Sequence, residues 1–339
     1  MALNPENEQH ALQIQAGTIG RKAGHAFEDT ITEEINIVLY PLKVPTKIIT
    51  HVNTGDPARL LLFYISSAYG CSEIIRASAI STGALATSED GKRWLEINGI
   101  GVTRCKSDLV ISLEFPNGIK KSVGVSTKQC NNKTPTNAQL YFTTARGFVN
   151  LLTKNSLKVP DAAITALRQF CGDIGFRPLD QTPPLTDRKT DPRRFFWEEI
   201  LEAGRLEWEN IFSKHQDDIS RLLLQKAYLD DQFSPDFLIH KTKNSTAWEN
   251  TEIALYSIDE LIHHSKNYGG FSLKPYSVRK GSYKDPHGVT HMAPRFGIIQ
   301  MQRGGQAQHP EQLQFNLEAG YFYKVSQQRP DMDGQSSSQ

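Results

Sequence analysis

Apolar and polar residues alternate along two stretches of the chain, residues 108–115 and 119–127, on either side of the sequence Pro-Asn-Gly at 116–118. Alternation with a period of two predicts strands, and the Pro-Asn-Gly sequence predicts a hairpin connection. Pairing the apolar positions of one strand with those of the other requires a three-residue loop, in which Gly118 is free to adopt positive φ.

Three polar side chains are expected to converge at one end of this hairpin. In the predicted register Asp108 lies opposite Ser126, with Lys128 two residues further along. Mg²⁺ prefers carboxylate ligands and keeps several waters, and a nearby ammonium can stabilise the negative charge that develops on a phosphate under attack. The three residues are therefore typical of phosphodiester hydrolysis, and a plain hairpin with a charged edge is the alternative interpretation.

A helical pattern precedes the hairpin. Its apolar residues recur near helical spacing, at Ala23, Phe27, Ile31, Ile35 and Val38, and the helix should end before Pro41. Glu28 directly follows Phe27, so it lies at the border of the apolar stripe, from which it could reach a sheet edge. The alternative is a solvated Glu among acidic neighbours.

The segment 106–131, KSDLVISLEFPNGIKKSVGVSTKQCN, resembles the core of PD-(D/E)xK nucleases, in which an Asp opens one strand and an acid-x-Lys sequence lies on the next. Asp108 corresponds to the first part, and Ser126 stands in place of the usual acid before Lys128. The sequence GHAFE around Glu28 resembles early helices of restriction endonucleases, and no acid occurs between Lys128 and Asp161. Glu28 is therefore the candidate for the missing carboxylate.

This resemblance implies a type II restriction endonuclease of a restriction-modification system, which uses Mg²⁺ to hydrolyse double-stranded DNA at specific sequences and acts as a homodimer. Asp108 and Glu28 would hold Mg²⁺, Lys128 would orient or activate the attacking water, and Ser126 would bond a metal-bound water. The implied fold is α/β: a restriction-endonuclease-like mixed central sheet flanked by helices, with a C-terminal α+β DNA-recognition region.

Two further segments are candidates for DNA contact. Amide and basic side chains at the start of the loop after Lys128 suit base edges and phosphates, although a loop with local hydrogen bonds is the alternative. Residues 268–305 contain clustered cations among glycines, which fits a phosphate backbone, or an ordinary basic hairpin. The candidate DNA-binding residues are Gln129, Asn131, Asn132, Lys133, Arg279, Lys280, Lys284, Arg295 and Arg303.

The remaining pattern predicts a strand at 60–65, a strand at 93–102, helices at 139–152 and 161–171, a strongly helical stretch at 193–229, a strand at 236–240, a short helix at 257–265 and strands at 296–305 and 312–317. We expect a catalytic nuclease core at 1–180, a linker at 181–192, a helical and β DNA-recognition region at 193–325 and a disordered tail at 326–339.

Composition adds little to this interpretation. The chain has 339 residues and a formal net charge of +1, so overall charge favours no nucleic-acid partner. Its four cysteines form no CxxC sequence, and no run approaches the ~20 apolar residues of a membrane span. We expect a cytoplasmic, prokaryotic protein. The alternatives are a repair or nicking nuclease with the same core, a non-catalytic DNA-binding protein on a nuclease scaffold, and an α/β protein with no nucleic-acid partner.

Overall fold

In a computed structural model of the chain, the described residues are 25–45, 50–82, 95–97, 99–102, 105–185, 193–226, 233–277, 290–303 and 312–326. They belong to two compact units, each assembled from separate stretches of sequence. The six-stranded unit contains residues from 25–136, 225–268 and 319–326, and the five-stranded unit contains Asn137–Leu224 and Gly269–Glu318. None of the described helices is long and apolar enough to cross a membrane.

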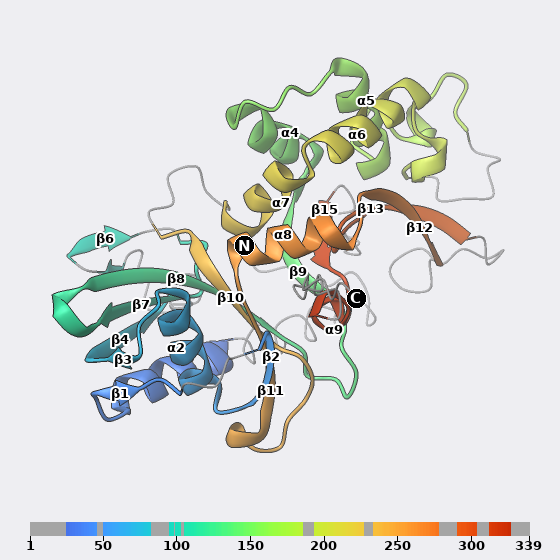
Figure 1. Cartoon of the computed structure of the whole chain (residues 1–339). Coiled ribbons are helices and arrows are strands. Elements are labelled where there is room, and N and C mark those ends of the chain that lie inside the picture. Colours follow the sequence, from blue (N-terminus) through green and yellow to red (C-terminus); the bar gives the residue numbers. More distant parts are fainter. Residues whose placement is uncertain are drawn as a thin grey trace, which may run out of the picture. The chain divides into compact units, whose positions relative to one another are not determined.

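The six-stranded unit is built around a mixed sheet with the strand order β2-β11-β10-β8-β7-β4. β10 runs parallel to β8, and the other neighbours are antiparallel (Figure 1). The strands are β2 (Val52–Gly55), β4 (Arg76–Ser81), β7 (Leu109–Glu114), β8 (Lys120–Gln129), β10 (Pro235–Lys241) and β11 (Thr251–Ser257). Two smaller sheets pair β1 (Leu42–Lys43) with β3 (Glu73–Ile74) and β5 (Leu95–Ile97) with β6 (Ile100–Val102).

Helices cover this sheet through a continuous apolar core. The helix of residues 25–37 and α2 (Pro57–Ala68) contribute buried residues to the same core cluster as the apolar face of the sheet. Ile31 and Ile35 of the first helix are fully buried, and full burial stabilises the fold by roughly 1.5–3 kcal/mol for each side chain of this size. η4 (Trp248–Asn250), α8 (Ile258–Tyr268) and α9 (Tyr321–Ser326) complete the unit. The predicted α/β class, with a mixed central sheet flanked by helices, is confirmed.

The hairpin of β7 and β8 has the register that the sequence predicts. Leu109 pairs with Val125, and the one-turn helix η1 (Pro116–Gly118) forms the three-residue loop. Gly118 has φ of 74°, in the left-handed region that its missing Cβ makes accessible. The backbone N–H of Phe115 donates to the carbonyl of Ile119 at 2.8 Å and closes the loop.

Several sequence-based expectations for the elements are wrong. Residues 60–65 lie inside the helix α2 and not in a strand. Asp56 begins this helix by accepting hydrogen bonds from the backbone N–H groups of Ala58 and Arg59, and Pro57 occupies its first turn. The apolar run at 60–65 resembles a strand in the sequence because an element that is buried on several sides shows no clear helical period. In place of one strand over 93–102, the two short strands β5 and β6 pair antiparallel.

The five-stranded unit contains an antiparallel sheet with the order β12-β13-β14-β15-β9. Its strands are β9 (Ala138–Thr144), β12 (Phe271–Ser277), β13 (Thr290–Phe296), β14 (Ile299–Arg303) and β15 (Gln312–Leu317). Its α-helices are α4 (Ala145–Lys154), α5 (Asp161–Cys171), α6 (Glu202–Lys214) and α7 (Gln216–Gln225). Its one-turn helices are η2 (Pro178–Asp180) and η3 (Trp197–Glu199). The rings of Phe148, Trp208, Phe212 and Phe296 stack in its core.

The helix predicted at 139–152 is half wrong, because its first residues form β9, which pairs with β15 at the sheet edge. Thr144 ends the strand and begins α4, where its hydroxyl accepts from the N–H of Gly147. The strand expected at 312–317 is confirmed as β15. Of the strand expected at 296–305, residues 299–303 form its partner β14, whereas Phe296 ends β13 and residues 304–305 lie outside the described part of the chain. The helix at 161–171 is confirmed as α5.

The domain boundaries expected from the sequence follow a different division from that of the compact units. The chain passes between the units at residues 136–137, 224–225, 268–269 and 318–319. Residues 186–192 of the predicted linker and 327–339 of the predicted tail lie outside the described part of the chain. The functional roles assigned to the predicted domains stay predictions.

Replacement of Gly124 by alanine should destabilise the six-stranded unit. A Cβ atom at this position in β8 would lie 2.2 Å from the Ser107 hydroxyl oxygen and 2.5 Å from the Ser234 carbonyl oxygen. We expect Gly124→Ala to lower the free energy of unfolding by about 1–3 kcal/mol in urea denaturation. Gly101→Ala is the control, because a Cβ there meets nothing within 4 Å. Equal stability of the two variants would contradict the prediction.

Candidate active site

The hairpin brings Asp108, Ser126 and Lys128 into direct contact. The Ser126 hydroxyl donates to Asp108 Oδ2 at 3.1 Å, and Lys128 Nζ donates to Ser126 Oγ at 3.0 Å. Lys128 Nζ lies 3.8 Å from Asp108 Oδ2 and also donates to the carbonyl of Thr127 at 2.7 Å. The predicted convergence of an acid, a hydroxyl and an ammonium is confirmed as geometry, while the catalytic roles of these residues stay predictions.

Thr127 joins the two carboxylates of the site. Its backbone N–H donates to Asp108 Oδ2 at 2.6 Å, and its hydroxyl donates to Glu28 Oε1 at 2.7 Å. Sequence reasoning missed Thr127 because it placed this residue on the apolar face of β8 with Val123 and Val125. The available signal was a polar residue at a core-facing position, since a buried hydroxyl requires a hydrogen-bond partner.

Glu28 lies on the helix of residues 25–37 and is buried, with 7% of its surface exposed. Burial, and to a smaller extent the negative charge of Asp108, raise the pKa of its carboxyl from 4.5 to about 7. The hydrogen bond from Thr127 and the charge of Lys128 act in the opposite direction and are weaker. Thr127 lies between Glu28 and Asp108 and donates a hydrogen bond to each carboxylate.

His240 lies beside Lys128 on the neighbouring strand β10, and sequence reasoning did not single it out. The two residues are register partners, and His240 is 1% exposed. Burial, and to a smaller extent the charge of Lys128, lower the pKa of His240 to about 3, so its imidazole is neutral at pH 7. His240 Nδ1 lies 3.4 Å from the Tyr321 hydroxyl. A neutral imidazole adds no second positive charge next to Lys128.

The donor set at this site fits Mg²⁺. Glu28 and Asp108 provide hard oxygen ligands, and Mg²⁺ is commonly held by one or two carboxylates with several waters. Thr127 contacts both carboxylates, through its backbone N–H and its hydroxyl, and so brings them to one site. Among the described residues, no group of three or more His, Cys, Asp or Glu side chains is placed to hold a metal ion, so protein ligands to Mg²⁺ here would be these two.

The predicted DNA-contact residues follow Lys128 directly, with Gln129 at the end of β8 and the others in the loop after it. Asn131, Asn132 and Lys133 are exposed, and Gln129 is half-buried. The carbonyl of Asn132 accepts from the backbone N–H of Asn244 at 2.8 Å, which ties this loop to the end of β10 within the same unit. Their contact with DNA stays a prediction.

The predicted contacts from the basic segment belong to the five-stranded unit. Arg295 is buried and forms an ion pair with Glu318 at 2.8 Å, while the guanidinium of Arg303 lies over the ring of Phe196 at 4.1 Å. Both side chains thus take part in the packing of their own unit. Arg279, Lys280 and Lys284 lie outside the described residues, and DNA contact by all five cations stays a prediction.

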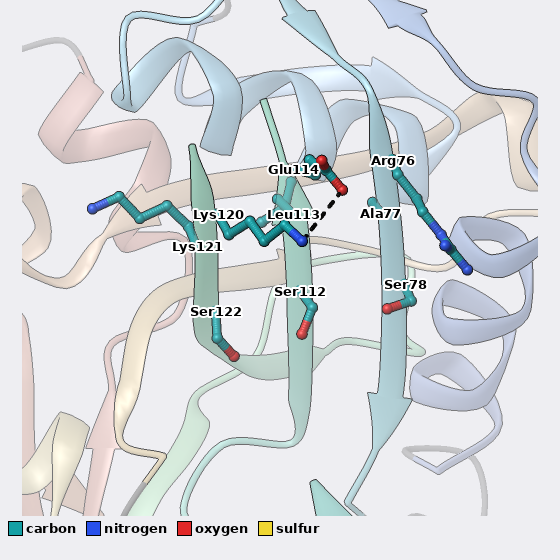
Figure 2. A pocket seen from close by; sticks show the side chains of 9 residues that line it. All are labelled: Arg76, Ala77, Ser78, Ser112, Leu113, Glu114, Lys120, Lys121 and Ser122. Atoms are coloured by element: carbon teal, nitrogen blue, oxygen red, sulfur yellow. Dashed lines mark ion pairs between the residues drawn. The ribbon is translucent and has the colours of Figure 1, made fainter. Parts of the chain in front are cut away.

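A hollow of about 440 Å³ lies on the sheet of the six-stranded unit, near the loop end of the hairpin. Figure 2 shows Ser78, Ser112 and Ser122 in one row across β4, β7 and β8, as the register pairs them. In the next row Lys120 Nζ lies 4.0 Å from Glu114 Oε2. Asp108 lies at the opposite end of β7, so this hollow is separate from the carboxylate pair.

Comparison with known proteins gives little beyond this geometry. No protein-family profile and no curated protein sequence matches the chain. Among solved structures, the chain is similar to the restriction endonuclease MspI in complex with its cognate DNA, with a TM-score of 0.46 and 13% sequence identity. The similarity covers 89% of this chain and 92% of that chain.

The raised pKa of Glu28 predicts a pH-dependent stability of the metal-free protein. The folded protein keeps a proton on Glu28 that the unfolded chain releases between pH 4.5 and about 7. The contribution of Glu28 to the free energy of unfolding therefore falls as the pH rises through this window. Urea denaturation with a chelator should show wild type losing stability relative to Glu28→Gln between these pH values. Parallel stability curves would contradict the raised pKa.

Proposed function

We propose that the protein is a type II restriction endonuclease that hydrolyses phosphodiester bonds of double-stranded DNA at specific sequences with Mg²⁺. The observation that carries this proposal is the pair of carboxylates bridged by Thr127, with the ammonium of Lys128 next to them. Oxygen ligands for a hard cation and a nearby fixed positive charge are what in-line attack on a phosphodiester requires.

Glu28 and Asp108 are the residues that would hold Mg²⁺, which when bound supplies Lewis-acid polarisation of a phosphoryl oxygen. Thr127 fixes the positions of both carboxylates through its backbone N–H and its hydroxyl. Hydrogen bonds to Ser126 and to the Thr127 carbonyl direct the Lys128 ammonium. In that position Lys128 can orient the attacking water and stabilise the charge that develops on the phosphate.

Ser126 has a supporting role in this proposal. A neutral hydroxyl is a poor replacement for a carboxylate as a ligand of Mg²⁺. Here it donates to Asp108 and accepts from Lys128, so it connects the acid to the ammonium and limits their movement. In this proposal Glu28, on the helix of residues 25–37, supplies the second carboxylate that the serine at position 126 does not.

Sequence specificity and a homodimer are further parts of the proposal. Cleavage of both strands of a two-fold symmetric site is served by two active sites related by the same symmetry, which favours a dimer. The exposed Asn131, Asn132 and Lys133 beside the site, and the basic segment 268–305, are the candidates for contact with DNA.

A non-catalytic DNA-binding protein on a nuclease scaffold is the second candidate. Two observations favour it: position 126 is a serine where the nuclease motif has an acid, and only two carboxylates lie at the site among the described residues. Such a protein would retain Asp108 and Lys128 as a hydrogen-bonded pair with a structural role.

Digestion of phage DNA separates these functions. With Mg²⁺ the protein should produce a discrete set of fragments, because a sequence-specific nuclease cuts each copy at the same positions. The same incubation with a chelator should leave the DNA intact. Nicked plasmid or a continuous smear would instead indicate a nicking or repair nuclease, and a gel shift without any Mg²⁺-dependent cleavage would indicate the non-catalytic protein.

Lys128→Ala should lower the rate of cleavage by about 10²–10³, as the loss of a single electrostatic stabiliser commonly does. Binding of DNA in a gel-shift assay should be retained, because the ammonium is proposed to act on the developing charge. Lys120→Ala is the matched control, since Lys120 is an exposed lysine near the other end of the same strand. Cleavage by Lys128→Ala at the wild-type rate would rule out the assignment.

A further inference from the structure

Two histidines of the six-stranded unit meet through their Nε2 atoms, away from the carboxylate pair. His51 precedes the edge strand β2, and His264 lies on α8. The two Nε2 atoms are 3.3 Å apart, and the imidazole planes cross at 83°. Both side chains are half-buried.

The hydrogen bond at the other nitrogen of His51 fixes its tautomer. Nδ1 lies 2.9 Å from the carbonyl oxygen of Leu255, which can only accept, so Nδ1 carries the proton. The Nε2 lone pair is therefore directed at His264. Metal-binding histidines have this same arrangement, in which the distal ring N–H donates to a backbone carbonyl and orients the ring.

The separation of the two nitrogens matches a tetrahedral metal centre. Zn²⁺ binds imidazole nitrogen at roughly 2.0–2.1 Å, and two ligands at the tetrahedral angle are then about 3.3–3.4 Å apart. The observed 3.3 Å also fits a hydrogen bond between the rings, with His264 Nε2–H as the donor. In both arrangements the Nε2 lone pair of His51 is the acceptor or ligand, and a bound cation would take the place of the His264 Nε2 proton.

Surrounding contacts hold His51 in place before any ligand binds. Its ring stacks on Tyr256 of β11, with ring centroids 4.5 Å apart and planes 11° apart. Tyr64 of α2 lies 3.4 Å from His51 Nδ1 and donates its own proton to Glu260 of α8 at 2.5 Å. Glu260 also accepts from the backbone N–H and the hydroxyl of Ser257. Three elements of the unit thus support the pair.

We infer that His51 and His264 form a binding site for a divalent transition metal, with Zn²⁺ as the best fit and waters as the remaining ligands. Imidazole nitrogen suits Zn²⁺, Ni²⁺ and Cu²⁺, whereas Mg²⁺ requires oxygen ligands, so this site differs in metal class from the carboxylate pair. A metal here would connect the segment before β2 to α8 and stabilise that edge of the unit. The inference does not depend on the proposed nuclease function.

Titration of the full-length protein with Zn²⁺ in a calorimeter, in excess Mg²⁺, tests the site. Wild type should bind one Zn²⁺ that His264→Ala binds at least about tenfold more weakly, because loss of even an outer-shell contact commonly costs 10–100-fold in metal affinity. His51→Ala should show the same loss. Two controls should bind as wild type does: Asp108→Ala, which removes a carboxylate of the candidate active site, and His215→Ala, which removes a half-buried histidine beside Asp218.

Thermal unfolding provides the second measurement. Zn²⁺ should raise the unfolding midpoint of wild type and of both controls, and should raise that of His264→Ala clearly less, since stabilisation by a ligand falls with its affinity. His264→Ala decides the outcome if His51→Ala fails to fold. Equal Zn²⁺ affinity of wild type and His264→Ala would overturn the inference and would leave the two rings joined by a hydrogen bond only.

Discussion

The three-residue loop Pro116–Gly118 sets the register of β7 and β8, and the candidate active site depends on that register. Side chains alternate along a strand, so a slip by one residue would carry Ser126 and Lys128 to the apolar face and Thr127 to the polar face. The Asp108 carboxylate would then lose the Ser126 hydroxyl and the Lys128 ammonium. The loop Pro116–Gly118 lies at the other end of the hairpin from Asp108, and it nevertheless determines which side chains contact the Asp108 carboxylate.

The same register places two chemically different surfaces on β8. Ser126 and Lys128 point to the polar side with Asp108, while Thr127 points toward the helix that carries Glu28. The site is therefore assembled across the strand itself, with the backbone N–H of Thr127 on one carboxylate and its side chain on the other. Burial of Glu28 follows from this position, because its helix must cover the apolar face to exclude water from the core.

Local patterns predicted much of the fold and part of the site. Several elements could be predicted because their apolar residues have a clear period or because Pro and Gly mark their ends. These are the hairpin, α5, β10, α8 and the pair β14–β15. Glu28 was identified through a resemblance and not through its spacing, because nothing local shows that it reaches Asp108. Thr127, His240 and the pair of His51 with His264 were missed, since each contact joins residues on different elements. The strand β9 was misassigned because its partner β15 lies far away in the sequence.

The parallel pairing of β8 with β10 has a consequence for dissection of the protein. Parallel neighbours cannot be joined by a tight turn, and here the connection between them includes the whole of Asn137–Leu224. Any contiguous fragment that retains the complete six-stranded sheet must therefore also carry a large part of the five-stranded unit. Truncation from either end cannot isolate the carboxylate site with its sheet intact, and separation of the two units would require new connections in place of two native segments.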